Sequence, residues 1–87
     1  MNETITVTDI RRTPGVVFDK VMQGNRLTVT LGGLPVAIIA PPDGRANASV
    51  SSTYLVTHLG SVIPASAPVA ITSYSRVIAE VLPYEEN

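Results

Sequence analysis

The side chains of this sequence that could carry out catalysis are few and scattered. His58 is the single histidine and cysteine is absent, which excludes thiolate nucleophiles, disulfides and cysteine-based zinc sites. No second metal ligand stands at a suitable spacing from His58, and no nucleophile can be matched with a base and an orienting group. His58 stands at helical spacing from Tyr54 and Leu55, so we interpret it as a partly buried structural histidine. We expect no enzymatic activity, no bound metal and no cofactor.

A pair of adjacent arginines offers a different chemistry, the recognition of phosphate or base edges. Thr8 followed by Asp9 is typical of a helix start, because the hydroxyl can accept a free backbone N–H and the carboxylate suits the positive end of the helix dipole. A short helix over residues 8–13 would then carry Arg11 and Arg12 beside that positive end, where guanidinium and N–H groups favour contacts with nucleic acid. The alternative is a pair of solvated surface arginines. Composition favours this alternative, since the net charge is −1 and the pI is near 5.6.

The first half of the chain has a clear pattern of elements around these arginines. Alternating β-branched residues predict a strand over residues 3–7, followed by the short helix and by a second helix from Pro14 to about Gln23. Period-two alternation before Gly32 and an apolar run after Gly33 predict a hairpin of residues 26–31 and 34–40. Two prolines and an Asp-Gly pair end it.

The second half has a weaker pattern. Apolar and aromatic residues from Val50 to Leu59 stand at helical spacing and predict a helix that ends at Gly60. A second stripe, from Tyr74 to Leu82, predicts an amphipathic helix that Pro83 stops. A helix this short is not stable alone in water, so its stripe requires a surface on which to dock. No internal repeat is visible in the sequence.

The composition points to a partner. The chain has 87 residues, enough for one small domain, and only 15% of them are charged, against about 25% in typical soluble proteins. No formal charge occurs between Ala46 and Ser75, and this stretch lacks the apolar run that a membrane span requires. The N-terminus does not read as a secretory signal. We expect a cytoplasmic protein, without membrane contact, that self-associates or binds another protein.

A set of segments in the first half resembles a known family. The segments, in chain order, are Ile5–Arg12, Pro14-Gly15, Phe18–Val21, Gly24, Leu27–Thr30 and Gly33–Ile39. Together they resemble the prevent-host-death antitoxins, the Phd/YefM type of type II toxin-antitoxin systems, over residues 4–41. The resemblance implies a homodimeric module that binds operator DNA and represses its own operon, joined to a C-terminal segment that wraps and neutralises a toxin.

Arg11 falls on the characteristic arginine of that family, and Arg12 is adjacent. The sequence departs from the family in two places. Leu31 stands where many members have a basic residue, which removes a cation from the expected DNA-binding face. The uncharged stretch between Ala46 and Ser75 replaces the charged, amphipathic segment that family members usually have.

The sequence therefore predicts an α+β fold in which a Phd/YefM-like β-α-α-β-β module, residues 1–43, dimerises and binds DNA. Residues 44–87 are predicted to be a toxin-binding extension with one or two helices. The expected DNA contacts are Thr8, Arg11 and Arg12, and the expected toxin contacts are Tyr54, Leu55, Tyr74, Val77, Ile78, Val81 and Leu82. The predicted function is that of an antitoxin with cognate toxin, operator DNA and a second copy as partners. The alternative is a protein-interaction or immunity module that does not bind DNA.

Overall fold

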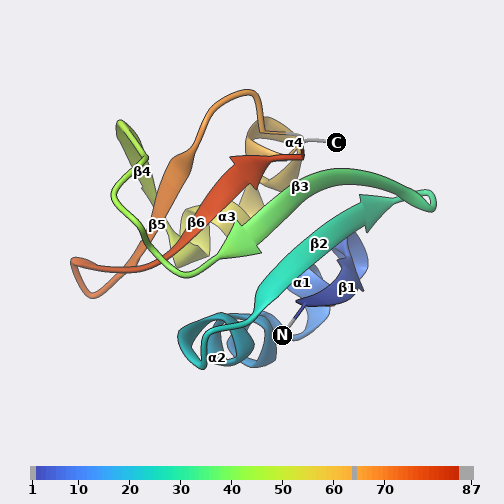
Figure 1. Cartoon of the computed structure of the whole chain (residues 1–87), viewed down its shortest axis with the longest axis horizontal. Helices are drawn as coiled ribbons and strands as arrows, with labels where there is room; N and C mark the ends of the chain where they lie inside the picture. The colour runs from blue at the N-terminus through green and yellow to red at the C-terminus, as the bar shows by residue number, and fades with distance from the viewer. Residues whose placement is uncertain (1, 64, 85–87) are drawn as a thin grey trace.

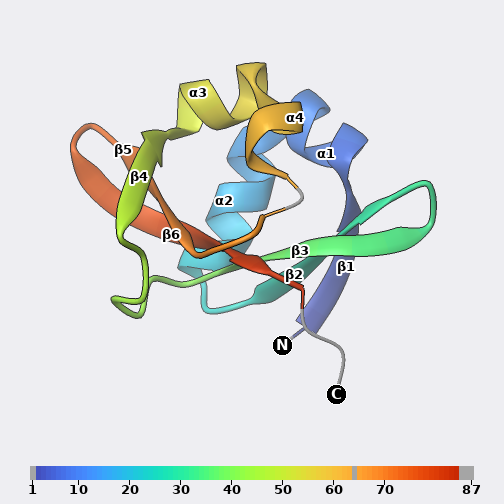
Figure 2. The same ribbon diagram turned by 90° about the horizontal axis from the view of Figure 1, so that it is seen from above.

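One mixed sheet organises the part of the chain that the computed structural model describes, residues 2–63 and 65–84. These residues form, in chain order, β1 (Asn2–Thr6), α1 (Val7–Arg12), α2 (Pro14–Met22), β2 (Arg26–Leu31), β3 (Leu34–Ala40), β4 (Ala48–Ser51), α3 (Ser52–Thr57), α4 (Leu59–Val62), β5 (Val69–Ser73) and β6 (Arg76–Pro83). The sheet has six strands in the order β1-β2-β3-β6-β5-β4. All four of these helices lie against one face of the sheet (Figures 1 and 2).

This architecture corrects the fold class expected from the sequence. The chain was expected to hold a five-element module that needs a second copy, followed by a helical extension. Residues 44–87 instead supply β4, β5 and β6 to the same six-stranded sheet as the first half. The two halves meet at the centre, where β3 pairs antiparallel with β6.

The expected C-terminal helix was wrong, and the reason lies in its residue pattern. Val77 and Val81 stand four apart, which fits a helix, but Val77, Ala79 and Val81 also alternate at period two, which fits a strand. The segment forms β6, which pairs with β5 on one side and β3 on the other, so its backbone groups find partners in two ladders. Pairing with β3 and β5 therefore decides between a helix and a strand, which the residue spacing of this segment fits equally well.

The other elements follow the sequence more closely. The β2–β3 hairpin is confirmed, and β1 and α2 lie near their expected positions. The first helix begins at Val7 rather than at Thr8, because Thr6 is its N-cap. The helix expected over 50–59 is instead β4 followed by α3 and α4, with His58 in the non-helical link between the two helices.

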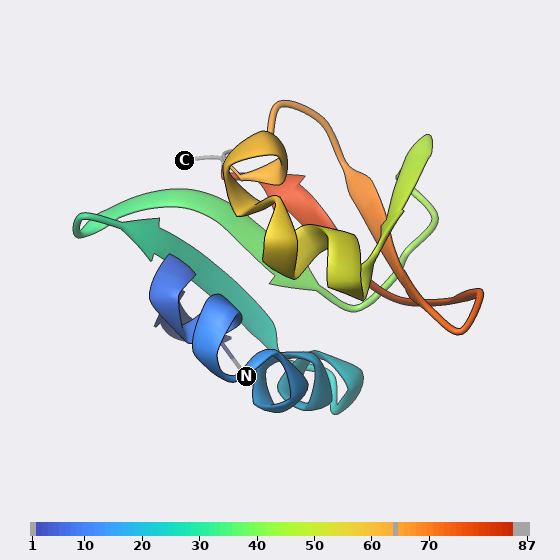
Figure 3. The same cartoon turned by 180° about the vertical axis from the view of Figure 1, so that it is seen from behind.

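The core lies between the sheet and the helices. Ile10 anchors α1 and Leu55 anchors α3, and both side chains are fully buried. Facing them from the sheet are fully buried residues of four central strands, Leu27 and Val29, Ile39, Ile71, and Val81. Figure 3 shows the four helices crossing this face from the side opposite to Figure 1.

The link from β3 to β4 crosses the sheet. Because β3 is central and β4 is at an edge, the connecting segment has to pass β6 and β5 (Figure 2). Glu80 of β6 is 2% exposed, and its Oε2 accepts backbone N–H bonds from Asp43 at 3.2 Å and Gly44 at 3.0 Å. Its neighbours Ala79 and Val81 belong to the core on the helix side, so the alternation of a strand points Glu80 to the other face. The link therefore runs over the face that the helices leave open.

Candidate functional site

The arginine-bearing helix α1 is fixed at its start by a reciprocal cap. The Asp9 backbone N–H donates to Thr6 Oγ1 at 3.1 Å, and the Thr6 backbone N–H donates to Asp9 Oδ2 at 2.9 Å, which is the capping-box arrangement. The bond from the Thr6 backbone N–H lowers the pKa of Asp9, and the Thr6 hydroxyl and the positive charges of Arg12 and Lys20 act in the same direction. Ile10, fully buried, then fixes which side of the helix faces solvent.

The arginines lie at the opposite end of this helix from the one expected. Arg11 and Arg12 occupy its last turn, where the helix dipole is negative and cations stabilise the helix. The expectation that they sit beside free N–H groups at the positive end was wrong, because the cap at Thr6 moves the start of the helix toward the N-terminus. A phosphate site built jointly from N–H groups and guanidinium groups is therefore absent from α1.

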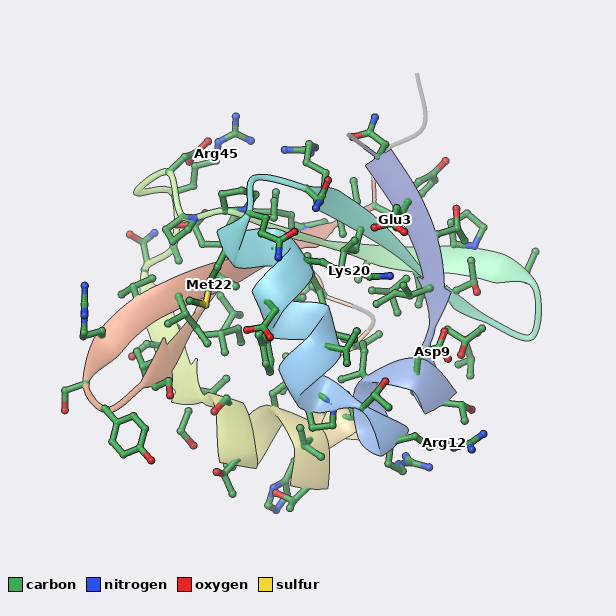
Figure 4. The ribbon with its side chains drawn as sticks, turned by 90° about the horizontal axis from the view of Figure 1, so that it is seen from below. Glu3, Asp9, Arg12, Lys20, Met22 and Arg45 are labelled. Atoms are coloured by element: carbon green, nitrogen blue, oxygen red, sulfur yellow. The ribbon has the colours of Figure 1, made fainter. Side chains whose placement is uncertain are left out.

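Thr8, Arg11 and Arg12 nevertheless share an accessible surface. All three are exposed, and Figure 4 shows Arg12 extending outward from α1. Among the described residues, the ion pairs are Lys20–Glu3 at 3.3 Å and Arg45–Asp43 at 3.0 Å. Within that part of the chain, both guanidinium groups of α1 are thus left without a carboxylate at ion-pair distance.

A second surface, an open groove of about 970 Å³, lies between α2, α3 and the β5–β6 hairpin. Its α2 wall includes Phe18, Asp19 and Met22, and its α3 wall includes Val56. The hairpin contributes Tyr74, Arg76, Val77 and Ile78. We call this surface the α2–α3 groove.

Large apolar side chains in this groove are exposed to solvent. Met22 is 62% exposed, Val77 is 49% exposed and Tyr74, at the hairpin tip, is fully exposed. Figure 4 shows Met22 extending from the end of α2 toward the hairpin. Apolar surface gathered in a concave site is typical of protein-binding positions rather than of scattered surface residues.

The structure brings together only part of the predicted toxin-binding set. Tyr74, Val77 and Ile78 line the α2–α3 groove. Leu55, Val81 and Leu82 are buried in the fold and cannot contact a partner. Tyr54 is outside the groove lining and stacks on His58 with ring centroids 4.2 Å apart. His58 is exposed rather than partly buried, and its Nδ1 lies 2.9 Å from Thr57 Oγ1.

Sequence reasoning missed several groove residues. Phe18, Met22, Val56 and Arg76 are not among the contacts expected from the sequence. Their proximity depends on the pairing of β6 with β3, which carries the hairpin to α2, and no local pattern signals that pairing. Among the described residues, no cluster of three or more potential metal ligands occurs, and no helix is long and apolar enough to cross a membrane.

The chain matches no family model, no curated protein and no solved structure. The resemblance to the prevent-host-death antitoxins therefore stays a prediction, and the groove and the α1 surface have to be interpreted on their own chemistry.

Proposed function

We propose that this chain is an antitoxin-like protein that neutralises a partner protein by holding a segment of it in the α2–α3 groove. The observation that supports this most directly is the concentration of exposed apolar side chains, Met22, Tyr74 and Val77, around one concave surface. A site of this kind gains binding free energy when a partner covers it and removes it from water.

The direction of binding differs from the one expected from the sequence. The residues from Tyr74 to Leu82 form a turn and a strand, so they cannot enter a groove of the toxin as a helix. The groove belongs to this chain, and the partner supplies the inserted segment. Phe18 and Ile78 contribute apolar lining, Met22 can adapt its flexible side chain to the segment, and Asp19 and Arg76 add one charge of each sign to the lining.

Groove variants test this proposal. Met22→Glu and Val77→Glu should each weaken binding to a co-expressed toxin, the product of a neighbouring reading frame, by about tenfold or more, because a carboxylate would be buried without a partner. Leu34→Glu is the matched control: Leu34 is 69% exposed but lies on the other hairpin, outside the groove lining. Equal binding by all three variants, measured by calorimetry, would remove the groove from the toxin interface.

A second proposed activity is DNA binding through Thr8, Arg11 and Arg12, which together with toxin binding would make the chain an autorepressor. Exposure of all three side chains on one short helix supports it. Arginines without a nearby carboxylate can contact phosphate oxygens or the edge of guanine. We further propose that both activities take place in the cytoplasm, where operator DNA and an intracellular toxin would be found.

Arg11→Ala tests the DNA-binding activity. Loss of one phosphate contact should weaken binding to the upstream DNA and flatten the dependence of log K on log salt by about 1. Arg45→Ala removes the same charge from the β3–β4 link, where Arg45 pairs with Asp43, and it should leave the slope unchanged. An unchanged mobility shift for Arg11→Ala would remove Arg11 from the site. A wild-type chain that shifts no upstream DNA would favour the alternative function, a protein-interaction or immunity module that does not bind DNA.

A further inference from the structure

The order strand, helix, helix, strand, strand occurs twice in this chain, and the agreement extends well beyond the order. In the sheet, β1 is parallel to β2 and β2 is antiparallel to β3, while β4 is parallel to β5 and β5 is antiparallel to β6. Residues 2–18 correspond to 47–63 by position in these elements, and residues 26–41 correspond to 68–83. We call the two segments 2–41 and 47–83 unit 1 and unit 2.

The helix boundaries agree in detail between the two units. Thr6 and Ser51 are corresponding N-caps, and their side-chain oxygens accept the N–H of the third following residue at 3.1 and 3.0 Å. Thr13 and His58 are the corresponding links between the two helices, with φ/ψ of −135/61° and −127/43°. The same backbone path is therefore taken by unrelated residue types.

The strand registers agree as well. The two parallel pairs, β1 with β2 and β4 with β5, place corresponding residues opposite each other. Both hairpins have an irregularity in their register at the corresponding position, Val29/Thr30 in unit 1 and Ile71/Thr72 in unit 2. A threonine hydroxyl bonds across the parallel pair in each unit: Thr30 Oγ1 donates to the Ile5 carbonyl at 3.2 Å, and Thr72 Oγ1 to the Val50 carbonyl at 3.4 Å. An irregularity and a side-chain bond that recur at one place are specific features, which sheets in general do not share.

The seam between β3 and β6 places the two units about a two-fold axis. Ile39 faces Val81 in the antiparallel ladder, and these two residues are also the corresponding positions of unit 1 and unit 2. Each strand of the pair therefore meets its own counterpart, which is the arrangement of an isologous interface. Here both sides of that interface belong to one chain.

We infer that this chain is an internal duplication, in which unit 2 covers the β3 edge of unit 1 that a second copy of the chain would otherwise have to cover. Identical residues at corresponding positions, such as Thr8 and Thr53, Gly15 and Gly60, and Thr30 and Thr72, agree with this. The repeat is hidden in the sequence because the second helices differ in length, with nine residues in α2 and four in α4, so that one fixed spacing does not align the whole unit.

The duplication has a direct consequence for how the chain is connected. The segment between Ala40 and Ala48 joins the end of unit 1 to the start of unit 2. A direct peptide bond from Asn87 to Met1 would place the same number of residues between Leu82 and Glu3, the corresponding positions. If the two units are equivalent, the new link from Leu82 to Glu3 spans the same distance as the natural link from Ala40 to Ala48. The natural link can then be opened without loss of the fold.

The test is a circular permutant with Asn87 joined to Met1 and the chain opened between Arg45 and Ala46, which keeps the Glu80 bonds to Asp43 and Gly44. A second permutant with Gly-Ser-Gly inserted at the join excludes strain in a direct join as a cause of failure. We expect a permutant with the near-UV circular dichroism and the amide NMR dispersion of the wild-type chain. We also expect the wild-type chain to elute as a monomer of 9.2 kDa in size exclusion with light scattering.

Two results would overturn the inference. One is that both permutants fail to give a folded monomer under conditions in which the wild-type chain is folded. The other is a wild-type chain that forms a dimer, together with an Ile39→Asp variant that loses the dimer and the fold at once. The β3–β6 seam would then join separate copies of the chain.

Discussion

Tyr74 and Ser75 hold a backbone conformation that their side chains disfavour. Their φ angles are 51° and 66°, whereas the corresponding turn of the other hairpin uses Gly32 and Gly33 at 60° and 83°. Glycine has no Cβ and adopts positive φ at little cost, while other residues there cost about 1 kcal/mol or more. The absence of glycine at this turn is also why sequence patterns place a helix, rather than a hairpin, over this region.

Replacing this turn with the glycines of its counterpart should stabilise the protein. Tyr74→Gly/Ser75→Gly is expected to raise the free energy of unfolding by about 1 kcal/mol, the relieved strain exceeding the added entropy of the unfolded chain. Denaturation in guanidinium chloride measures it. Ser61→Gly in α4, where the backbone is helical, should lower the same quantity. A destabilised turn variant would contradict the strain argument.

Asp9 gives the helix α1 a dependence on pH. Its pKa is lowered first by the Thr6 backbone N–H, so the folded chain binds a proton less readily than the unfolded one. The stabilisation is fully present above the ordinary pKa of about 4 and is lost as the pH falls through the lower folded value. Unfolding midpoints of the wild-type chain and Asp9→Asn should therefore differ at pH 7 and converge in acid. A constant difference across that range would show that the charge of Asp9 is not what the cap uses.

At the scale of elements, Glu80 connects β6 to the link between the two halves. Its buried carboxylate accepts two backbone N–H groups, and removing it leaves those donors without their acceptor. Glu80→Ala is expected to lower the free energy of unfolding by about 2 kcal/mol and Glu80→Gln by less, since the amide oxygen can still accept. Proteolysis of the native chain near Gly44 should also become faster. Glu3→Gln, at a partly exposed ion pair, is the control and should change stability by less than about 1 kcal/mol.

Elements with a local signal could be predicted, and elements defined by distant pairing could not. The β2–β3 hairpin has period-two alternation and two glycines at its turn, so its local pattern predicts a hairpin and no other structure. The β6 strand has a pattern that fits helix and strand equally, and its partners β3 and β5 decide between them. The candidate groove depends on the same pairing, so the sequence gives no signal that Met22 lines the same surface as Tyr74 and Val77.

At the scale of the whole molecule, the pseudo-two-fold axis relates two surfaces of different charge. The α1 surface carries Arg11 and Arg12, and the corresponding positions of α3 carry Val56 and Thr57. The uncharged stretch from Ala46 to Ser75 coincides with β4, α3, α4 and β5. The low charge of the composition is thus a property of unit 2, in which Arg76 is the single arginine or lysine, whereas Arg11 and Arg12 belong to unit 1.

This asymmetry predicts how the chain would bind a symmetric operator. Wild-type α1 can supply cations to one half-site only, whereas Val56→Arg/Thr57→Arg should supply them to both. The dependence of log K on log salt should steepen by roughly 2, one unit for each added phosphate contact. Val16→Arg/Leu34→Arg adds the same charge at exposed positions that the axis does not relate to Arg11 and Arg12, so it controls for general attraction to DNA. If both double variants steepen the salt dependence equally, the α3 surface does not occupy the position of a second half-site. If neither the variants nor the wild-type chain binds DNA, the DNA-binding proposal fails. The duplication does not depend on that result, because the permutants test it separately.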